Sequence, residues 1–148
     1  MLSNRQEAIG RSFLRRRLEA AIEHRRRVVE DSNAFRLVFG EGDLLPGLVV
    51  DRYGDYLVVQ TLSQGMDRLL EEIVSCLREL VEPAGILGRN DAAVRAKEGL
   101  PLEVKVLAGE IPERVEVRMH GLRFFADLVH GNADAGGRAD QEFVDVQR

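Results

Sequence analysis

The sequence has one cysteine, no tryptophan and only two lysines among its 148 residues. A lone Cys76 allows neither an internal disulfide nor a cysteine-based zinc site. The three histidines, His24, His120 and His130, are too dispersed to indicate metal ligands. The longest segment without a charged side chain, Tyr56 to Met66, has 11 residues and is too short to cross a bilayer. We therefore predict no metal site and no membrane partner.

The first residues of the chain also lack the apolar stretch of a secretory signal. The composition is 45% hydrophobic and 31% charged, which is typical of a globular protein. These observations predict a soluble, cytoplasmic protein. The length is sufficient for one domain but short for an enzyme that holds both a nucleotide-like cofactor and a macromolecular substrate.

Several common catalytic motifs are missing. The sequence contains neither a Gly-x-Gly-x-x-Gly nor a Gly-x-x-x-x-Gly-Lys-Ser/Thr phosphate-binding loop, and it has no Gly-x-Ser-x-Gly nucleophile elbow. The acidic residues between positions 41 and 55 do not have the spacing of a calcium loop. We assign no catalytic and no cofactor-binding residue to this chain.

Arginine, in contrast, is abundant and unevenly distributed. The chain has 19 arginines, and residues 1–27 hold eight of them against three glutamates, whereas the remainder has 13 basic and 22 acidic residues. The planar guanidinium suits phosphates and base edges, so this distribution permits a nucleic-acid partner. A salt-bridged helix surface is the alternative, because Arg15 and Glu19, and Glu23 and Arg27, are four residues apart.

The hydrophobic pattern predicts an α+β fold. It contains a small mixed or antiparallel sheet with one long amphipathic helix, preceded by a basic helix and followed by a β-hairpin. The predicted helices are 12–30, 64–81 and 92–98, with Ser63 before the second and Asn90-Asp91 as a turn or N-cap before the third. The predicted strands are 34–39, 48–51, 56–61, 85–89 and 104–107, with the hairpin at 115–119 and 122–127.

This pattern divides the chain into three parts. Residues 1–32 form a basic connector helix, residues 33–112 a central α/β module, and residues 113–148 the hairpin and a tail. The tail between 131 and 140 is small, polar and rich in glycine, so we expect it to be mobile.

Two segments carry distinctive motifs. The first has the form E-x-D-x-L-P-G-L-x-V-D-R-Y-G-D over residues 41–55, and the second has the form R-N-D-x-x-x-R-x-x-E-G-L over residues 89–100. Both resemble the central module of the SAM-dependent large-subunit rRNA cytosine-5 methyltransferases, and the resemblance covers residues of about 12 to 131.

This resemblance implies an α/β module that lies between a PUA RNA-binding domain and a Rossmann-like methyltransferase domain in full-length family members. We expect neither flanking domain in this chain, and we expect the SAM site and the catalytic cysteine of the family to lie outside it. Cys76 does not match the catalytic position, and its spacing in the 64–81 helix predicts a buried hydrophobe. SAM is thus a cofactor of the full-length family, and this chain is not predicted to be an enzyme on its own.

The predicted function is an RNA-binding module that positions substrate for rRNA processing. The candidate RNA contacts are Arg15, Arg16, Arg26, Arg27, Arg36, Arg52, Arg89 and Arg95. The alternative for Arg52 and Arg89 is a structural ion pair with Asp51, Asp55 or Asp91, and Arg95 can pair with Glu98 or hold a neighbouring backbone. The alternative function is a protein-interaction module that docks on a separate methyltransferase domain or forms a homodimer.

Overall fold

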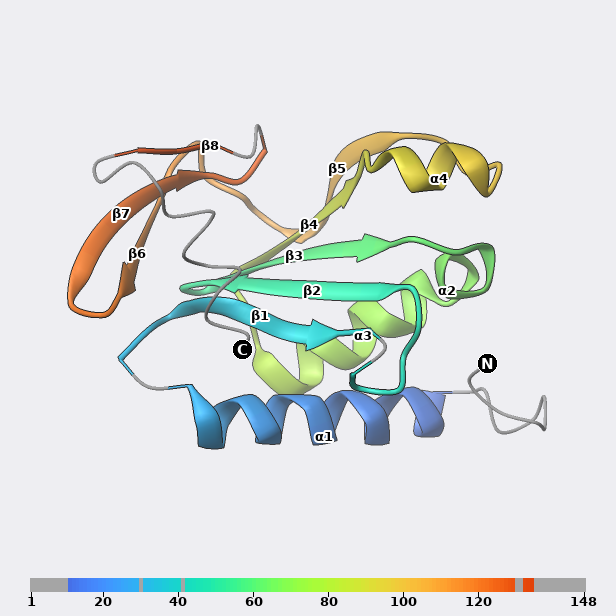
Figure 1. Ribbon diagram of the computed structural model, residues 1–148, viewed down its shortest axis with the longest axis horizontal. Coiled ribbons are helices and arrows are strands. Elements are labelled where there is room, and N and C mark those ends of the chain that lie inside the picture. The colour runs from blue at the N-terminus through green and yellow to red at the C-terminus, as the bar shows by residue number, and fades with distance from the viewer. Residues whose placement is uncertain (1–10, 30, 41, 130–131, 135–148) are drawn as a thin grey trace.

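The computed structural model describes residues 11–29, 31–40, 42–129 and 132–134 (Figure 1). The helices are α1 (Arg11–Val28), α2 (Gln64–Arg68), α3 (Leu70–Val81) and α4 (Ala93–Lys97). The strands are β1 (Ala34–Phe39), β2 (Leu48–Tyr53), β3 (Tyr56–Thr61), β4 (Gly85–Asn90), β5 (Glu103–Gly109), β6 (Val115–Met119), β7 (Leu122–Asp127) and β8 (Asn132–Asp134). No helix among these residues is long and apolar enough to cross a membrane.

The strands form two sheets. The larger sheet has the order β1-β2-β3-β4-β5, in which only the β3–β4 pair is parallel. The helical segment α2–α3 makes the long crossover that a parallel pair requires. The smaller sheet is antiparallel, with the order β6-β7-β8. These sheets and helices confirm the predicted α+β class, the mixed sheet and the hairpin, whereas the domain limits at residues 32 and 112 stay predictions.

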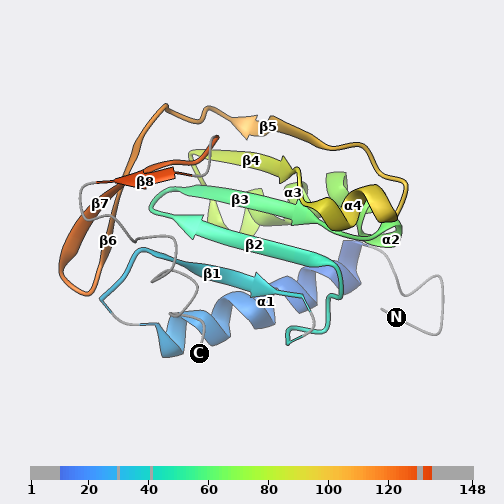
Figure 2. The same ribbon diagram turned by 45° about the horizontal axis from the view of Figure 1, so that its top comes forward.

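Helices α1 and α3 pack together against one face of the larger sheet (Figures 1 and 2). The apolar stripe of α1 is fully buried there through Leu14 and Leu18, and α3 contributes Ile73 and Leu77. Cys76 lies in the same layer and is buried, as its spacing predicted. Burial of these stripes supplies the main driving force for folding this layer.

The helix predicted from 64 to 81 is broken at Leu69, whose φ of −95° and ψ of 5° separate α2 from α3. Ser63, which opens the predicted helix, is the N-cap of α2, because its side chain accepts a hydrogen bond from the Met66 N–H at 3.2 Å. Asp67 is held by the hydroxyl of Thr61 at 2.8 Å, so the first turn is tied to the end of β3. Periodicity cannot reveal such a break, since both helices bury the same apolar face.

The tail departs from its prediction at residues 132–134. These residues form β8 and pair with β7 through Asp127↔Asn132 and Phe125↔Asp134, so this part of the expected mobile tail is an ordered strand. An exposed strand edge can recruit even a polar segment, because the ladder bonds come from the backbone. The rest of the 131–140 segment lies outside the described residues.

Hydrogen bonds of Asn33 and of Arg89 hold the two sheets together. Asn33 N–H donates to Arg118 O at 2.9 Å, and the Asn33 side chain accepts from the Arg118 N–H at 2.6 Å. At the other side, Arg89 donates to the carbonyl of Leu128 at 2.7 Å and lies 3.7 Å from Asp91. The predicted ion pair of Arg89 is thus present, and the same side chain fixes the smaller sheet against β4.

A substitution at Gly47 tests how closely the β1–β2 loop packs against Ser63. Its φ is +86°, and a Cβ at this position would lie 2.6 Å from the Ser63 Oγ. We expect Gly47→Ala to lower the free energy of unfolding by about 2 kcal/mol or more, because it adds both strain and a clash. Urea unfolding measures this change.

Gly65 provides the matched control, because it lies in α2 with no positive φ, and a Cβ added there would meet nothing within 4 Å. Gly65→Ala should leave stability unchanged or raise it by up to about 1 kcal/mol. If the two substitutions changed the free energy of unfolding equally, the close packing of the loop at Gly47 would be contradicted.

Candidate nucleic-acid interface

The first motif builds a tightly tied loop between β1 and β2. The Asp43 carboxylate accepts from the Phe39 N–H at 2.7 Å and from Arg25 at 3.2 Å. Arg25 is largely buried and also donates to the Arg36 carbonyl at 2.9 Å, so it fastens α1 both to β1 and to the loop. Leu45 is fully buried. The side chains of this motif therefore hold the loop and leave little free for a ligand; Glu41 lies outside the described residues.

Arg36 and Asp51 form an ion pair across β1 and β2, with Arg36 Nε 2.9 Å from the Asp51 carboxylate. Burial raises the pKa of the Asp51 carboxyl, and the hydrogen bond and positive charge of Arg36 act in the opposite direction. Arg52 donates instead to the Gly54 carbonyl at 2.8 Å. Among the described residues, Arg52 therefore forms none of the ion pairs predicted for it with Asp51, Asp55 or Asp91. Asp51 is out of reach because neighbouring residues of a strand point to opposite faces.

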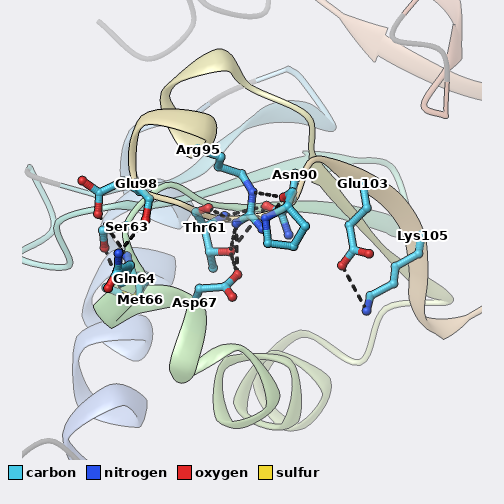
Figure 3. Close-up of polar contacts among 11 residues, drawn as sticks. Thr61, Ser63, Gln64, Met66, Asp67, Asn90, Arg95, Glu98, Glu103 and Lys105 are labelled. Atoms are coloured by element: carbon cyan, nitrogen blue, oxygen red, sulfur yellow. Dashed lines mark hydrogen bonds and ion pairs between the residues drawn. The ribbon is translucent and has the colours of Figure 1, made fainter.

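The second motif is centred on Arg95, which is only 1% exposed (Figure 3). Its guanidinium donates to the Thr61 carbonyl at 2.5 Å, to the Thr61 hydroxyl at 3.1 Å and to Asp67 at 3.0 Å. Two further bonds, of 3.0 and 2.9 Å, reach the Pro101 carbonyl. Arg95 thus holds backbone, which was one of its two predicted roles, and its burial removes it from the candidate RNA contacts.

The same network corrects two other sequence-based expectations. Asn90 does not cap α4; its side chain accepts from the Thr61 N–H at 2.9 Å, and the residue before the helix is Ala92, which has no side-chain cap. Glu98 does not pair with Arg95 but accepts from the Gln64 N–H at 3.3 Å (Figure 3). Both side chains instead join segments about 30 residues apart in the chain, which local spacing cannot reveal.

The arginines of α1 fall into two groups. Arg11 and Arg15 both bind Glu79 of α3, and Arg26 lies 3.3 Å from Glu23. The predicted pairs are therefore not the ones formed. Arg15 pairs with Glu79 of α3 instead of Glu19, and Glu23 pairs with Arg26 instead of Arg27. Arg16 and Arg27 are exposed, and neither has an acidic partner in the part of the chain that the structure describes.

Two further arginines, missed by the sequence analysis, lie on the hairpin. Arg118 of β6 and Arg123 of β7 are direct cross-strand partners, and both are exposed. Like charges opposite one another destabilise a hairpin, so this arrangement favours a bound anion. Glu116 offsets it in part, since it lies 3.6 Å from Arg123. The signal was available in the sequence: a two-residue turn at His120-Gly121 places 118 opposite 123.

The hairpin turn lies beside the C-terminal end of α1 (Figures 1 and 2). His120 N–H donates to the Asp31 carbonyl at 2.9 Å, and Ser32 forms a bridge with Met119. These contacts bring Arg26 and Arg27 of α1 to the same end of the molecule as Arg118 and Arg123. We call these four side chains the arginine surface. Two of the four lie near a carboxylate, since Arg26 is 3.3 Å from Glu23 and Arg123 is 3.6 Å from Glu116.

Metal chemistry finds no support among the described residues, where no group of three or more histidine, cysteine or acidic side chains could hold an ion. Most of the polar side chains described for the two motifs instead contact the backbone or one another, whereas Asp55 is exposed. The exposed guanidinium groups of the arginine surface are the side chains of this region whose charge suits an anionic partner.

Comparisons with known proteins agree with the motifs. The chain is 36% identical over 129 residues to ribosomal RNA large subunit methyltransferase I of Shigella boydii and of Escherichia coli, and 36% identical over 132 residues to that of Shigella flexneri. This chain is a partial module homologous to those methyltransferases. The matches cover 85–87% of the chain but only 33% of each relative's length. No family model matches the chain.

Solved structures show the same fold. A Streptococcus mutans protein described as a SAM-dependent methyltransferase superposes with a TM-score of 0.73 at 19% sequence identity, over 88% of this chain and 34% of that one. A methyltransferase solved in complex with SAH gives the same TM-score and identity over 89% of this chain and 33% of that one. The methyltransferase-like module is therefore one third of a longer architecture in these proteins.

The Asp67 carboxylate gives the module a testable acid sensitivity. Burial acts to raise its pKa, but hydrogen bonds from Thr61 and Arg95 and the charges of Arg95 and Lys105 outweigh burial, so the pKa is lowered. Stabilisation by the ionised form is then fully present above the unfolded-state pKa and is lost as the pH falls through the folded-state value.

We expect Asp67→Asn to lower the free energy of unfolding by about 1–2 kcal/mol near neutral pH, and this deficit should shrink as the pH falls toward about 2. Urea unfolding across this range measures it. Asp55→Asn, at an exposed aspartate, is the control and should show no such convergence. A deficit that stays constant from neutral to acid pH would contradict the assigned ion pair.

Proposed function

We propose that this chain binds ribosomal RNA and helps to position it for a SAM-dependent methyltransferase, without carrying out methyl transfer by itself. The homologous large-subunit rRNA methyltransferases support the RNA partner and the reaction type. The observation that carries the proposal is the arginine surface, in which Arg118 and Arg123 face each other without full compensation. The cytoplasmic location expected from the sequence belongs to this proposal.

The geometry narrows the set of candidate contacts. Arg36, Arg52 and Arg89 are half-buried and hold carboxylates or backbone carbonyls, so they would contribute to RNA binding only by giving up those partners. Arg15 is bound to Glu79. Arg16 and the arginine surface remain as exposed groups suited to phosphates, and within that surface only Arg26 and Arg123 lie near a carboxylate among the described residues. Phosphate contacts of this kind position a nucleic acid without reading its sequence.

Salt dependence tests the proposal, because each phosphate contact releases bound counterions. We expect the 148-residue chain to bind deproteinised large-subunit rRNA with an affinity that falls steeply with salt. The double variant Arg118→Ala/Arg123→Ala should lower the affinity, and the slope of log affinity against log salt should decrease by about 1 for each lost contact. Filter binding over a salt series measures both.

Arg68→Ala is the matched control, because Arg68 is an exposed arginine on α2, at the end of the molecule opposite the hairpin (Figure 1). It should leave the slope unchanged. Thermal unfolding should show that the double variant is at least as stable as the parent, since it removes a like-charge pair. Absence of rRNA binding by the parent at low salt would refute the function, whereas equal slopes for all variants would refute only the surface.

Methyl transfer needs a pocket for SAM and a group placed against the target base. Since both motifs are occupied in scaffolding, we expect calorimetric titration of the chain with SAM to give no saturable binding heat. A one-to-one binding isotherm would overturn the non-catalytic part of the proposal while leaving the RNA-binding part intact.

A further inference from the structure

Strand β5 is the outer strand of the larger sheet on the side away from β1 (Figure 2). It pairs with β4, and no other described strand lies along its free edge. None of its seven residues is buried, and Val106 is 50% exposed. Such an edge presents a row of unpaired backbone donors and acceptors, which can template another strand.

The sequence along this edge alternates between apolar and charged residues. Leu102, Val104 and Val106 share one face, and Leu102 is 52% exposed. Glu103 and Lys105 share the other face and form an exposed ion pair of 3.2 Å (Figure 3). Because Glu103 neutralises Lys105, the edge lacks the net charge with which isolated edge strands avoid pairing.

We propose that β5 pairs with β5 of a second copy, antiparallel and centred on Val104, and so joins the two larger sheets into one. This register places Glu103 opposite Lys105 of the second copy, and Lys105 opposite its Glu103. It also places Leu102 opposite Val106 on the apolar face. Opposite charges and apolar pairs directly across two strands are both stabilising.

The charge pattern selects this register over its neighbours. In an antiparallel pair, residues directly opposite each other point to the same face of the sheet. A symmetric pair is therefore centred on a residue, and the neighbouring registers are centred on the residues next to Val104. Centring on Glu103 or on Lys105 brings two like charges face to face. Centring on Val106 sets Lys105 against Leu107 and Glu103 against Gly109, which removes both charge pairs. Only the Val104 register satisfies every charged side chain of the edge.

Two features limit the length of the paired segment. Pro101 lacks a backbone N–H and cannot donate to a ladder. At the other end, the β4–β5 register shifts between Ile86 and Leu87, which bends the strand after Val106. The segment from Leu102 to Val106 is therefore the part of the edge that is straight and able to pair. A contact of this length predicts a reversible dimer whose population depends on concentration.

A charge exchange tests the register directly. Glu103→Lys leaves only lysines at the two positions, and Lys105→Glu leaves only glutamates, so each variant alone should be monomeric or dissociate at least about tenfold more readily. An equimolar mixture should form a heterodimer, because every lysine then faces a glutamate. The double variant Glu103→Lys/Lys105→Glu should dimerise like the parent. Sedimentation velocity over a concentration series measures all four samples.

Lys97→Glu is the control, since Lys97 is exposed on α4 and lies outside the paired segment. It should leave the dimer unchanged, and thermal unfolding should show that each variant is folded. A parent chain that stays monomeric up to about millimolar concentration overturns the proposal, as does a dimer that ignores the single charge changes.

A cross-link provides a second, independent measurement. Val104 faces its own copy in the proposed register, so Val104→Cys should form an intermolecular disulfide on mild oxidation. Cys76 is buried and does not compete. The exposed position of Lys97→Cys is the comparison, and equal cross-linking at both positions would refute the register. None of these variants changes a residue of the arginine surface. A failure of dimerisation would therefore leave the proposed RNA binding unaffected, and the reverse also holds.

Discussion

The buried guanidinium of Arg95 is the contact on which the arrangement of the larger sheet depends. It touches the end of β3 through Thr61, the first turn after that strand through Asp67, and the loop before β5 through Pro101. A buried charge of this kind is costly unless each donor finds a partner. Here five hydrogen bonds reach three acceptor residues, so the cost is offset while three separate segments acquire one fixed geometry.

Arg95 also explains why the second motif has its spacing. Asn90 lies at the end of β4, where its side chain accepts from the Thr61 N–H. Glu98 follows the last residue of α4, where its carboxylate accepts from the Gln64 N–H. The short helix between them places Arg95 over the end of β3. The spacing of the second motif therefore reflects tertiary contacts. The same holds for the first motif, in which Asp43 binds Arg25 of α1 and the Phe39 N–H. The two motifs thus hold the fold together, and the exposed arginines of the arginine surface lie outside both of them.

The sequence predicted the fold where the signal was local, and it failed where partners are distant. Alternation and turn residues predict the strands at 34–39 and 56–61 and the hairpin at 115–119 and 122–127, and the structure confirms them. The break at Leu69 and the strand β8 depend on tertiary contacts that leave no periodic trace. The arginines show the same division, because Arg15 finds Glu79 across a helix pair although Glu19 is nearer in the chain.

The two proposed surfaces lie at different places on one rigid scaffold. Strand β6 begins a few residues after β5 ends, so each hairpin follows the C-terminal end of its own β5 strand. In an antiparallel β5 pair, the C-terminal end of one strand lies beside the N-terminal end of the other. The two hairpins, and the arginine surfaces beside them, would then lie at opposite ends of the joined sheet. Such a dimer presents two separate basic surfaces to RNA, and Arg89 and Asn33 hold each hairpin in a fixed orientation to the strand that makes the dimer.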